Sequence, residues 1–92
     1  MTRRVVWRAK ARAQAREIIV YIADRNPAAA ERLADRFEDA VDRLPDHPHV
    51  HRPGRVSGTR EAIVHPNYII IYRVGESVIE VVAVLHARQR YP

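Results

Sequence analysis

Two consecutive runs of β-branched and aromatic residues, Tyr68–Val74 and residues 78–85, constrain the fold of this chain most strongly. Side chains that crowd Cβ are stiff and fit a pleated surface, so both runs favour strand over helix. Gly75, Glu76 and Ser77 separate the runs and make a connection short enough for a β-hairpin. Apolar side chains occupy both faces of each run, which is typical of strands in the middle of a sheet. The hairpin is therefore predicted to form the centre of the fold.

The length and composition predict one small domain, residues 1–92, without cysteine. A chain of this size buries a small core, and neither a disulfide nor a thiolate zinc site supplements it. No apolar run is long enough to span a bilayer. Arg3 and Arg4 are not followed by the apolar core of a signal peptide. These features are typical of a small cytoplasmic protein.

The residues before the hairpin predict one short strand and a first helix. Residues 4–8 alternate weakly, as in a strand, and residues 9–25 carry apolar side chains at helical spacing. Arg12 and Arg16 fall on the opposite face of this helix. The helix is therefore predicted to be amphipathic.

A second helix and a third strand candidate complete the pattern. Asn26 is a typical N-cap and Pro27 suits the first helical position, so residues 28–44 are predicted to be helical. Proline and glycine punctuate residues 47–58, which indicates a loop, and Thr59–His65 is a strand candidate. The predicted order is β-α-α-β-β-β. This order favours an α+β fold of two layers, with an antiparallel helical hairpin packed on a roughly four-stranded, mainly antiparallel sheet.

The charge of the chain is unevenly distributed and consists almost entirely of arginine. Lys10 is the one lysine among 16 basic residues, and the net charge is +5. Residues 1–16 contribute +6, residues 17–46 contribute −4 and residues 47–92 contribute +3. Arginine binds carboxylate and phosphate equally well. The pattern therefore fits an acidic protein or a nucleic acid as partner, or a compositional bias without function.

Metal and cofactor chemistry has little support in the sequence. His47, His49 and His51 recur at every second residue, but the prolines among them indicate a solvated, mobile turn, which rarely supplies defined ligand geometry. No glycine-rich phosphate loop or base-assisted serine motif is present. We therefore predict no metal and no cofactor.

The C-terminal end of the chain is the candidate for chemistry. His86 and Arg88 follow the last predicted strand. Three further residues on or beside neighbouring strands, Arg60, His65 and Arg73, are at positions that could converge with them. RNA cleavage can use the 2′-OH of the substrate as nucleophile, so a proton-transfer group and fixed positive charge are sufficient. The alternative is a basic tail that binds an acidic partner.

Nearly the whole chain resembles the RelE/ParE family of type II toxin–antitoxin toxins. The resemblance rests on the order and spacing of several motifs, namely a first strand that ends in Trp7 and residues 16–23, 26–30, 52–55, 58–61, 67–73 and 84–88. It implies the element order given above and a toxin that a cognate antitoxin neutralises. In this family the antitoxin typically lays an acidic, otherwise disordered C-terminal segment across the toxin, which suits the arginine excess.

The family divides by mechanism into ParE-like inhibitors of DNA gyrase and RelE-like enzymes that cut messenger RNA on the ribosome. Residues 52–61 look more like the ParE branch. Tyr68 and Ile69 stand where ribonuclease members often carry a basic residue. The resemblance therefore implies a ParE-like toxin that binds gyrase and is not an enzyme.

The alternative is a ribosome-dependent endoribonuclease, an mRNA interferase, in which His86 transfers protons and Arg60, Arg73 and Arg88 hold phosphate. A plain nucleic-acid-binding domain lacks an aromatic stacking platform in the sequence. On either toxin mechanism, contacts to the target or the antitoxin are expected from Arg12, Arg16, Arg60, Arg73, Arg88, Arg90 and Tyr91.

Overall fold

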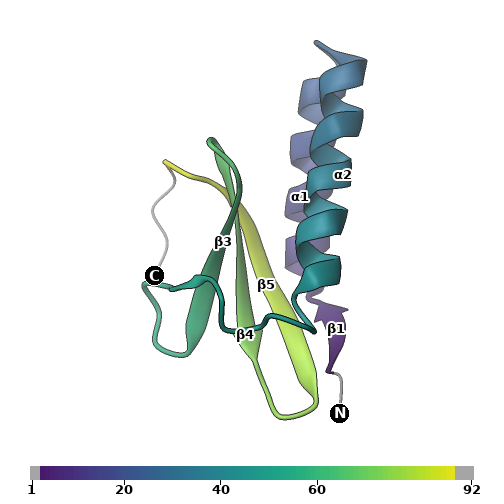
Figure 1. Ribbon diagram of the computed structural model, residues 1–92. Coiled ribbons are helices and arrows are strands. Elements are labelled where there is room, and N and C mark those ends of the chain that lie inside the picture. Colours follow the sequence, from purple (N-terminus) through teal and green to yellow (C-terminus); the bar gives the residue numbers. More distant parts are fainter. Residues whose placement is uncertain (1–2, 89–92) are drawn as a thin grey trace.

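The hairpin of β4 (Tyr68–Val74) and β5 (Val78–His86) lies at the centre of the protein, as predicted (Figure 1). Its strands pair antiparallel, and the register shifts by one residue between Ile71 and Tyr72, where β5 contains the extra residue Val82. The Gly75 N–H donates a hydrogen bond of 2.8 Å to the carbonyl oxygen of Val78, which closes the turn. The computed structural model describes residues 3–88.

Three further strands complete a mixed sheet of order β1-β5-β4-β3-β2. β3 (Thr59–His65) pairs antiparallel with β4, whereas β1 (Arg4–Trp7) pairs parallel with β5. β2 (Arg52–Pro53) pairs antiparallel with β3. The element order is therefore β-α-α-β-β-β-β.

The strand β2 corrects the prediction of a loop throughout residues 47–58 and of about four strands. The pairing places Arg52 opposite Glu61, and their side chains form an ion pair with an Nε–Oε1 distance of 2.7 Å. A strand of two residues that includes a proline is too short to show alternation. Its pattern therefore left no signal in the sequence.

Two antiparallel helices, α1 (Ala9–Ala23) and α2 (Pro27–Arg43), cover one face of the sheet (Figure 1). The side-chain oxygen of Asn26 accepts a hydrogen bond of 3.1 Å from the N–H of Ala29, which confirms the predicted cap. Neither helix is long and apolar enough to cross a membrane, within residues 3–88.

The core fills the space between the helices and the sheet. α2 contributes Leu33, Phe37 and Val41, and the sheet contributes fully buried side chains, among them Ile70, Tyr72, Ile79, Val81 and Val84. On the helix-free face, Ile69, Ile71 and Leu85 form a second buried cluster. Apolar side chains therefore lie on both faces of the central hairpin, and the predicted two-layer α+β fold is confirmed.

Candidate functional site

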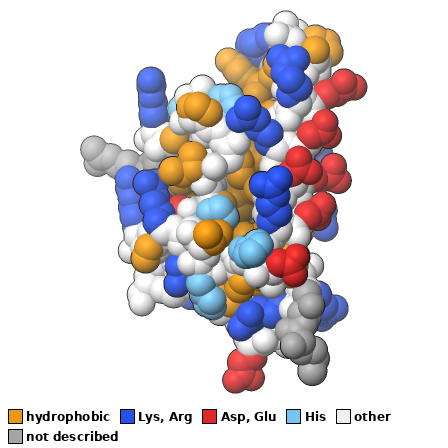
Figure 2. Space-filling model, in the orientation of Figure 1, with side chains coloured by type: hydrophobic (Ala, Val, Ile, Leu, Met, Phe, Trp, Pro, Cys, Tyr) orange, Lys and Arg blue, Asp and Glu red, His pale blue; other side chains and the backbone are white. Residues whose placement is uncertain are grey.

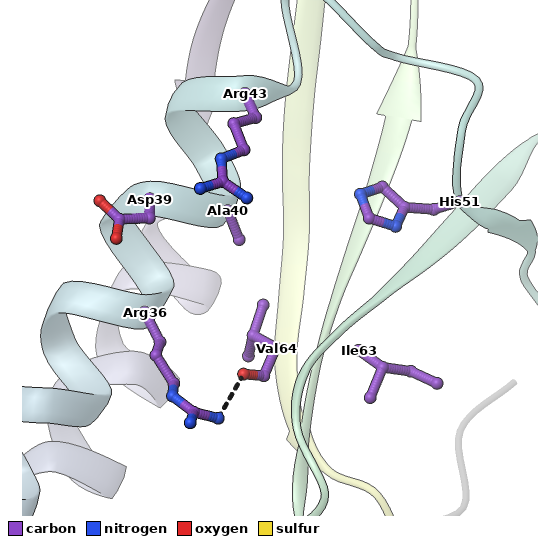
Figure 3. Close-up of a pocket in the computed structure, with 7 residues that line it drawn as sticks. All are labelled: Arg36, Asp39, Ala40, Arg43, His51, Ile63 and Val64. Atoms are coloured by element: carbon purple, nitrogen blue, oxygen red, sulfur yellow. Dashed lines mark hydrogen bonds between the residues drawn. The ribbon is translucent and has the colours of Figure 1, made fainter.

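A groove separates α2 from the edge of the sheet at β3. We call it the α2–β3 groove and define it by Arg32, Arg36, Ala40, Arg43, His51 and Val64. It consists of two hollows of about 330 and 350 Å³, and Arg36 lines both. Figure 3 shows Arg36 and Arg43 extending from α2, with the ring of His51 facing α2 from the opposite side. Ala40 and Val64 give the groove an apolar floor between these polar walls.

The helical wall of the groove is basic because the basic and acidic residues of α2 lie on different sides of the helix. At about 100° per residue, Arg32, Arg36 and Arg43 fall within about 40° of one another, next to the buried stripe of the helix. The acidic residues Glu31, Asp35, Glu38, Asp39 and Asp42 occupy the adjoining outer stripe. Figure 2 shows red side chains gathered along the outer edge of α2 and blue ones nearer the sheet.

The three groove arginines are not neutralised by these carboxylates. The ion pairs among residues 3–88 are Arg8–Glu80 and Arg52–Glu61. Arg36 donates one long hydrogen bond, 3.4 Å from Nη1 to the carbonyl oxygen of Val64 (Figure 3). Asp39 also lines the first hollow without forming an ion pair. Positive charge that faces the groove is therefore available to a bound anion.

The opposite wall is a loop that two side chains of the sheet hold in place. Arg60 donates from Nη1 to the carbonyl oxygens of His49 and His51, at 3.2 and 2.7 Å. The hydroxyl of Tyr72, a fully buried residue, donates to the carbonyl oxygen of Pro48 at 2.8 Å. The predicted solvated turn at residues 47–51 is thus anchored to β3 and β4 through its backbone, while His47 and His49 remain exposed.

The ring of His51 is held between this wall and the groove. It packs edge-to-face on Tyr72 with 5.9 Å between ring centroids. Burial lowers the pKa of His51 below its ordinary value, and the positive charge of Arg60 lowers this pKa further. The ring therefore enters the groove in its neutral form near pH 7.

A second polar cluster surrounds Tyr68 at one end of the groove. The rings of His65 and His86 both contact the Tyr68 ring, with centroid distances of 5.7 and 5.3 Å. Nδ1 of His65 accepts from the N–H of Asn67 at 3.0 Å, and Nδ1 of His86 accepts from the N–H of Arg88 at 3.1 Å. These hydrogen bonds assign the proton of each neutral ring to Nε2. Two imidazoles thus flank one phenol ring, and the Nδ1 atom of each is held by a backbone N–H.

The structure brings His65 and His86 each against Tyr68, from opposite sides, but it does not bring Arg60 and Arg73 there. Tyr68 pairs with His86 at one end of β4, whereas Arg73 pairs with Glu80 at the other end. Five residues of strand span about 17 Å at about 3.3 Å each. Arg60 lies opposite Tyr72 and is equally remote from His86. The expected convergence of these arginines on His86 is therefore not found.

The other predicted contact residues lie on separate surfaces. Arg73 donates at 3.4 Å to the carbonyl oxygen of Ser57, and Arg12 stacks over the Trp7 ring at 5.4 Å. Arg16 and Arg88 are exposed. Arg90 and Tyr91 were also predicted, and both lie outside the described residues.

The sequence prediction missed the groove arginines, although a signal for them existed. Arg32, Arg36 and Arg43 are spaced by four and seven residues, which places them on one side of a helix. Projection of α2 onto a helical wheel would have separated them from the acidic stripe. The opposite wall left no such signal, because its contacts join residues that are far apart in the sequence.

A helical hairpin on one face of a mixed sheet, with a basic groove beside it, defines a small toxin-like domain of the RelE/ParE type, and comparisons with known proteins agree. The model of the family described as "ParE toxin of type II toxin-antitoxin system, parDE" matches residues 5–91. "Putative toxin Y4kP" of Sinorhizobium fredii is 40% identical over 91 residues, which are 98% of this chain and 94% of that protein.

Two further similarities support this assignment. "Toxin RelE2" of Caulobacter vibrioides is 36% identical over 85 residues, with 90% of this chain and 93% of that protein covered. The structure of the chromosomal ParDE toxin–antitoxin system from P. aeruginosa shares the fold, with a TM-score of 0.80, 20% identity and coverage of 94% and 96%. The chain belongs to the ParE/RelE family of toxins of type II toxin–antitoxin systems.

Proposed function

We propose that this toxin arrests growth in the cytoplasm by binding DNA gyrase, and that a cognate antitoxin with an acidic segment neutralises it. The observation that supports binding rather than catalysis is the distance between His86 and the arginines predicted to hold phosphate. A phosphorane that forms at His86 needs fixed positive charge within hydrogen-bond reach. Arg60 on β3 and Arg73 on β4 lie in the halves of these strands that are remote from His86. Each donates a hydrogen bond to a loop carbonyl group.

The family model supports the same choice. It is a model of ParE toxins, and it matches the chain almost from end to end. Residues 52–61, which resemble the ParE branch, comprise β2, the turn that follows it and the start of β3. In that turn the Thr59 hydroxyl donates to the carbonyl oxygen of Val56 at 2.6 Å, which fixes the loop that ends in Gly58. A rigid surface of this kind suits recognition of a protein target.

A second candidate function, the ribosome-dependent endoribonuclease, is favoured by the cluster at Tyr68. His65 and His86 bring two imidazoles, a group that can act as acid or as base, to the same phenol ring. An acid and a base are the minimum for cleavage that uses the 2′-OH. This mechanism would take its phosphate contact from Arg88, which follows His86 in the chain, with Arg60 and Arg73 left out.

Two assays with purified protein distinguish these functions. We expect the protein to inhibit supercoiling of relaxed plasmid by DNA gyrase and to leave messages intact in a translating extract. Shortened messages together with unimpaired supercoiling would replace the first proposal by the second. Heat-inactivated protein at the same concentration controls for nonspecific binding of a basic chain to DNA.

A further inference from the structure

We infer that the α2–β3 groove is the docking site for an acidic segment of the antitoxin, whose carboxylates pair with Arg32, Arg36 and Arg43. The inference rests on the proposed toxin–antitoxin function. None of its three arginines is among the contact residues predicted from the sequence, which were Arg12, Arg16, Arg60, Arg73, Arg88, Arg90 and Tyr91.

The charge of the groove favours an acidic partner. Three guanidinium groups line the groove and one carboxylate, Asp39, lies among them. The side chains of Arg32 and Arg43 form no hydrogen bond or ion pair with the described residues, and that of Arg36 donates one long bond to a carbonyl oxygen. Guanidinium groups bind carboxylates with two parallel hydrogen bonds. The groove is therefore ready to accept carboxylates without breaking an existing ion pair.

The acidic side chains beside the groove favour a polypeptide over a nucleic acid. The acidic stripe of α2, with Glu31, Asp35 and Asp42, runs beside the arginines for the length of the helix. A nucleic acid strand carries a charge at every phosphate and would be repelled by this stripe. A polypeptide carries its carboxylates at intervals and offers apolar side chains between them. It can therefore face the arginines with its charges and the floor with its apolar groups.

The length of the groove fits a short segment of polypeptide. From Arg32 to Arg43 the helix rises about 17 Å, at about 1.5 Å per residue. About six extended residues span this distance. Ala40 and Val64 provide apolar contact below such a segment, and the neutral ring of His51 borders it without a charge that must be desolvated. The partner is thus a short stretch in which acidic and apolar residues alternate.

The test measures affinity between this chain and the product of the reading frame beside its gene. Two double variants remove the same charge from different surfaces: Arg36→Gln with Arg43→Gln in the groove, and Arg12→Gln with Arg16→Gln on α1. The groove variant is expected to lose about tenfold or more in affinity, and the α1 variant less than about threefold. Single Arg43→Gln, whose side chain makes no described contact, should lose affinity with an unchanged melting temperature.

Other outcomes overturn the inference. Tight binding that the groove variant leaves within about threefold of wild type would place the segment elsewhere and leave the toxin–antitoxin function intact. Absence of any complex with wild-type protein would refute the proposed partner and its site together. Tight binding of a single-stranded RNA oligonucleotide that the groove variant abolishes would identify nucleic acid as the occupant instead.

Discussion

The Arg60 guanidinium donates a hydrogen bond of 2.7 Å to the carbonyl oxygen of His51 and a second, of 3.2 Å, to that of His49. Arg60 was predicted to hold phosphate at a ribonuclease site. Its position instead joins β3 to the loop that forms one wall of the α2–β3 groove. A residue type that suits phosphate also suits paired carbonyl groups, because both are hydrogen-bond acceptors.

Replacement of Arg60 by Met is therefore expected to destabilise the protein. The loss of two charge-assisted hydrogen bonds to carbonyl groups should reduce the free energy of unfolding by about 1–3 kcal/mol. Urea denaturation measures this change. Tyr72→Phe, which removes only the bond to Pro48, should cost less, about 1 kcal/mol. Wild-type stability in Arg60→Met would contradict the structural role.

The lowered pKa of His51 predicts a dependence of stability on pH. The unfolded chain takes up a proton at His51 as the pH falls through about 6.5, whereas the folded state resists that proton until lower pH. The free energy of unfolding should therefore decrease below about pH 6.5. Besides Arg60, the charged groups that face the ring across the groove are Arg43, Arg36 and Asp39.

The measurement is urea unfolding at several pH values between 7.5 and 5. His51→Gln should show a smaller loss of stability across this range than wild type. His49→Gln is the matched control, because His49 is exposed and its ring has no described contact. Equal pH slopes in wild type and His51→Gln would show that another group is responsible.

The elements that were predicted correctly have signals within a few residues. The cap of Asn26 acts on Ala29, and the side chains of β4 and β5 indicate strand at each position. β2 has two residues and a proline, and the parallel pairing of β1 with β5 joins positions about 74 residues apart, as in Arg4 and Val78. Neither leaves a local pattern.

The candidate site was predicted less well for the same physical reason. The sequence indicates which residue types could hold phosphate, but the strand register decides whether they meet. Register separates Arg73 from His86 and leaves His65 and His86 on opposite sides of Tyr68. The groove depends on the docking of α2 against β3, which is a tertiary contact.

His86→Ala is predicted to remain toxic. If the toxin acts by binding gyrase, the imidazole transfers no proton, and its loss removes an edge-to-face contact with Tyr68 and a hydrogen bond from the N–H of Arg88. Growth arrest after induction should be within about twofold of wild type, since such a surface change alters stability by well under about 1 kcal/mol. Loss of toxicity in a variant with wild-type melting temperature would favour the ribonuclease.

Gly58 is predicted to tolerate alanine poorly. Its φ of 85° lies in the left-handed region that favours glycine. Gly58→Ala should therefore lower the free energy of unfolding by about 1–2 kcal/mol. Gly58→Asn should cost less, because asparagine adopts positive φ more readily. Thermal unfolding of the two variants measures the difference, and equal stability of Gly58→Ala and wild type would contradict the backbone account.

The most direct test of the proposed function is recovery of covalent complexes between gyrase and DNA from cells that express this toxin. The account predicts that these complexes accumulate as growth stops, in wild type and His86→Ala alike, and that co-expression of the antitoxin prevents them. Growth arrest without such complexes, accompanied by cleavage of messages within their coding regions, would contradict it.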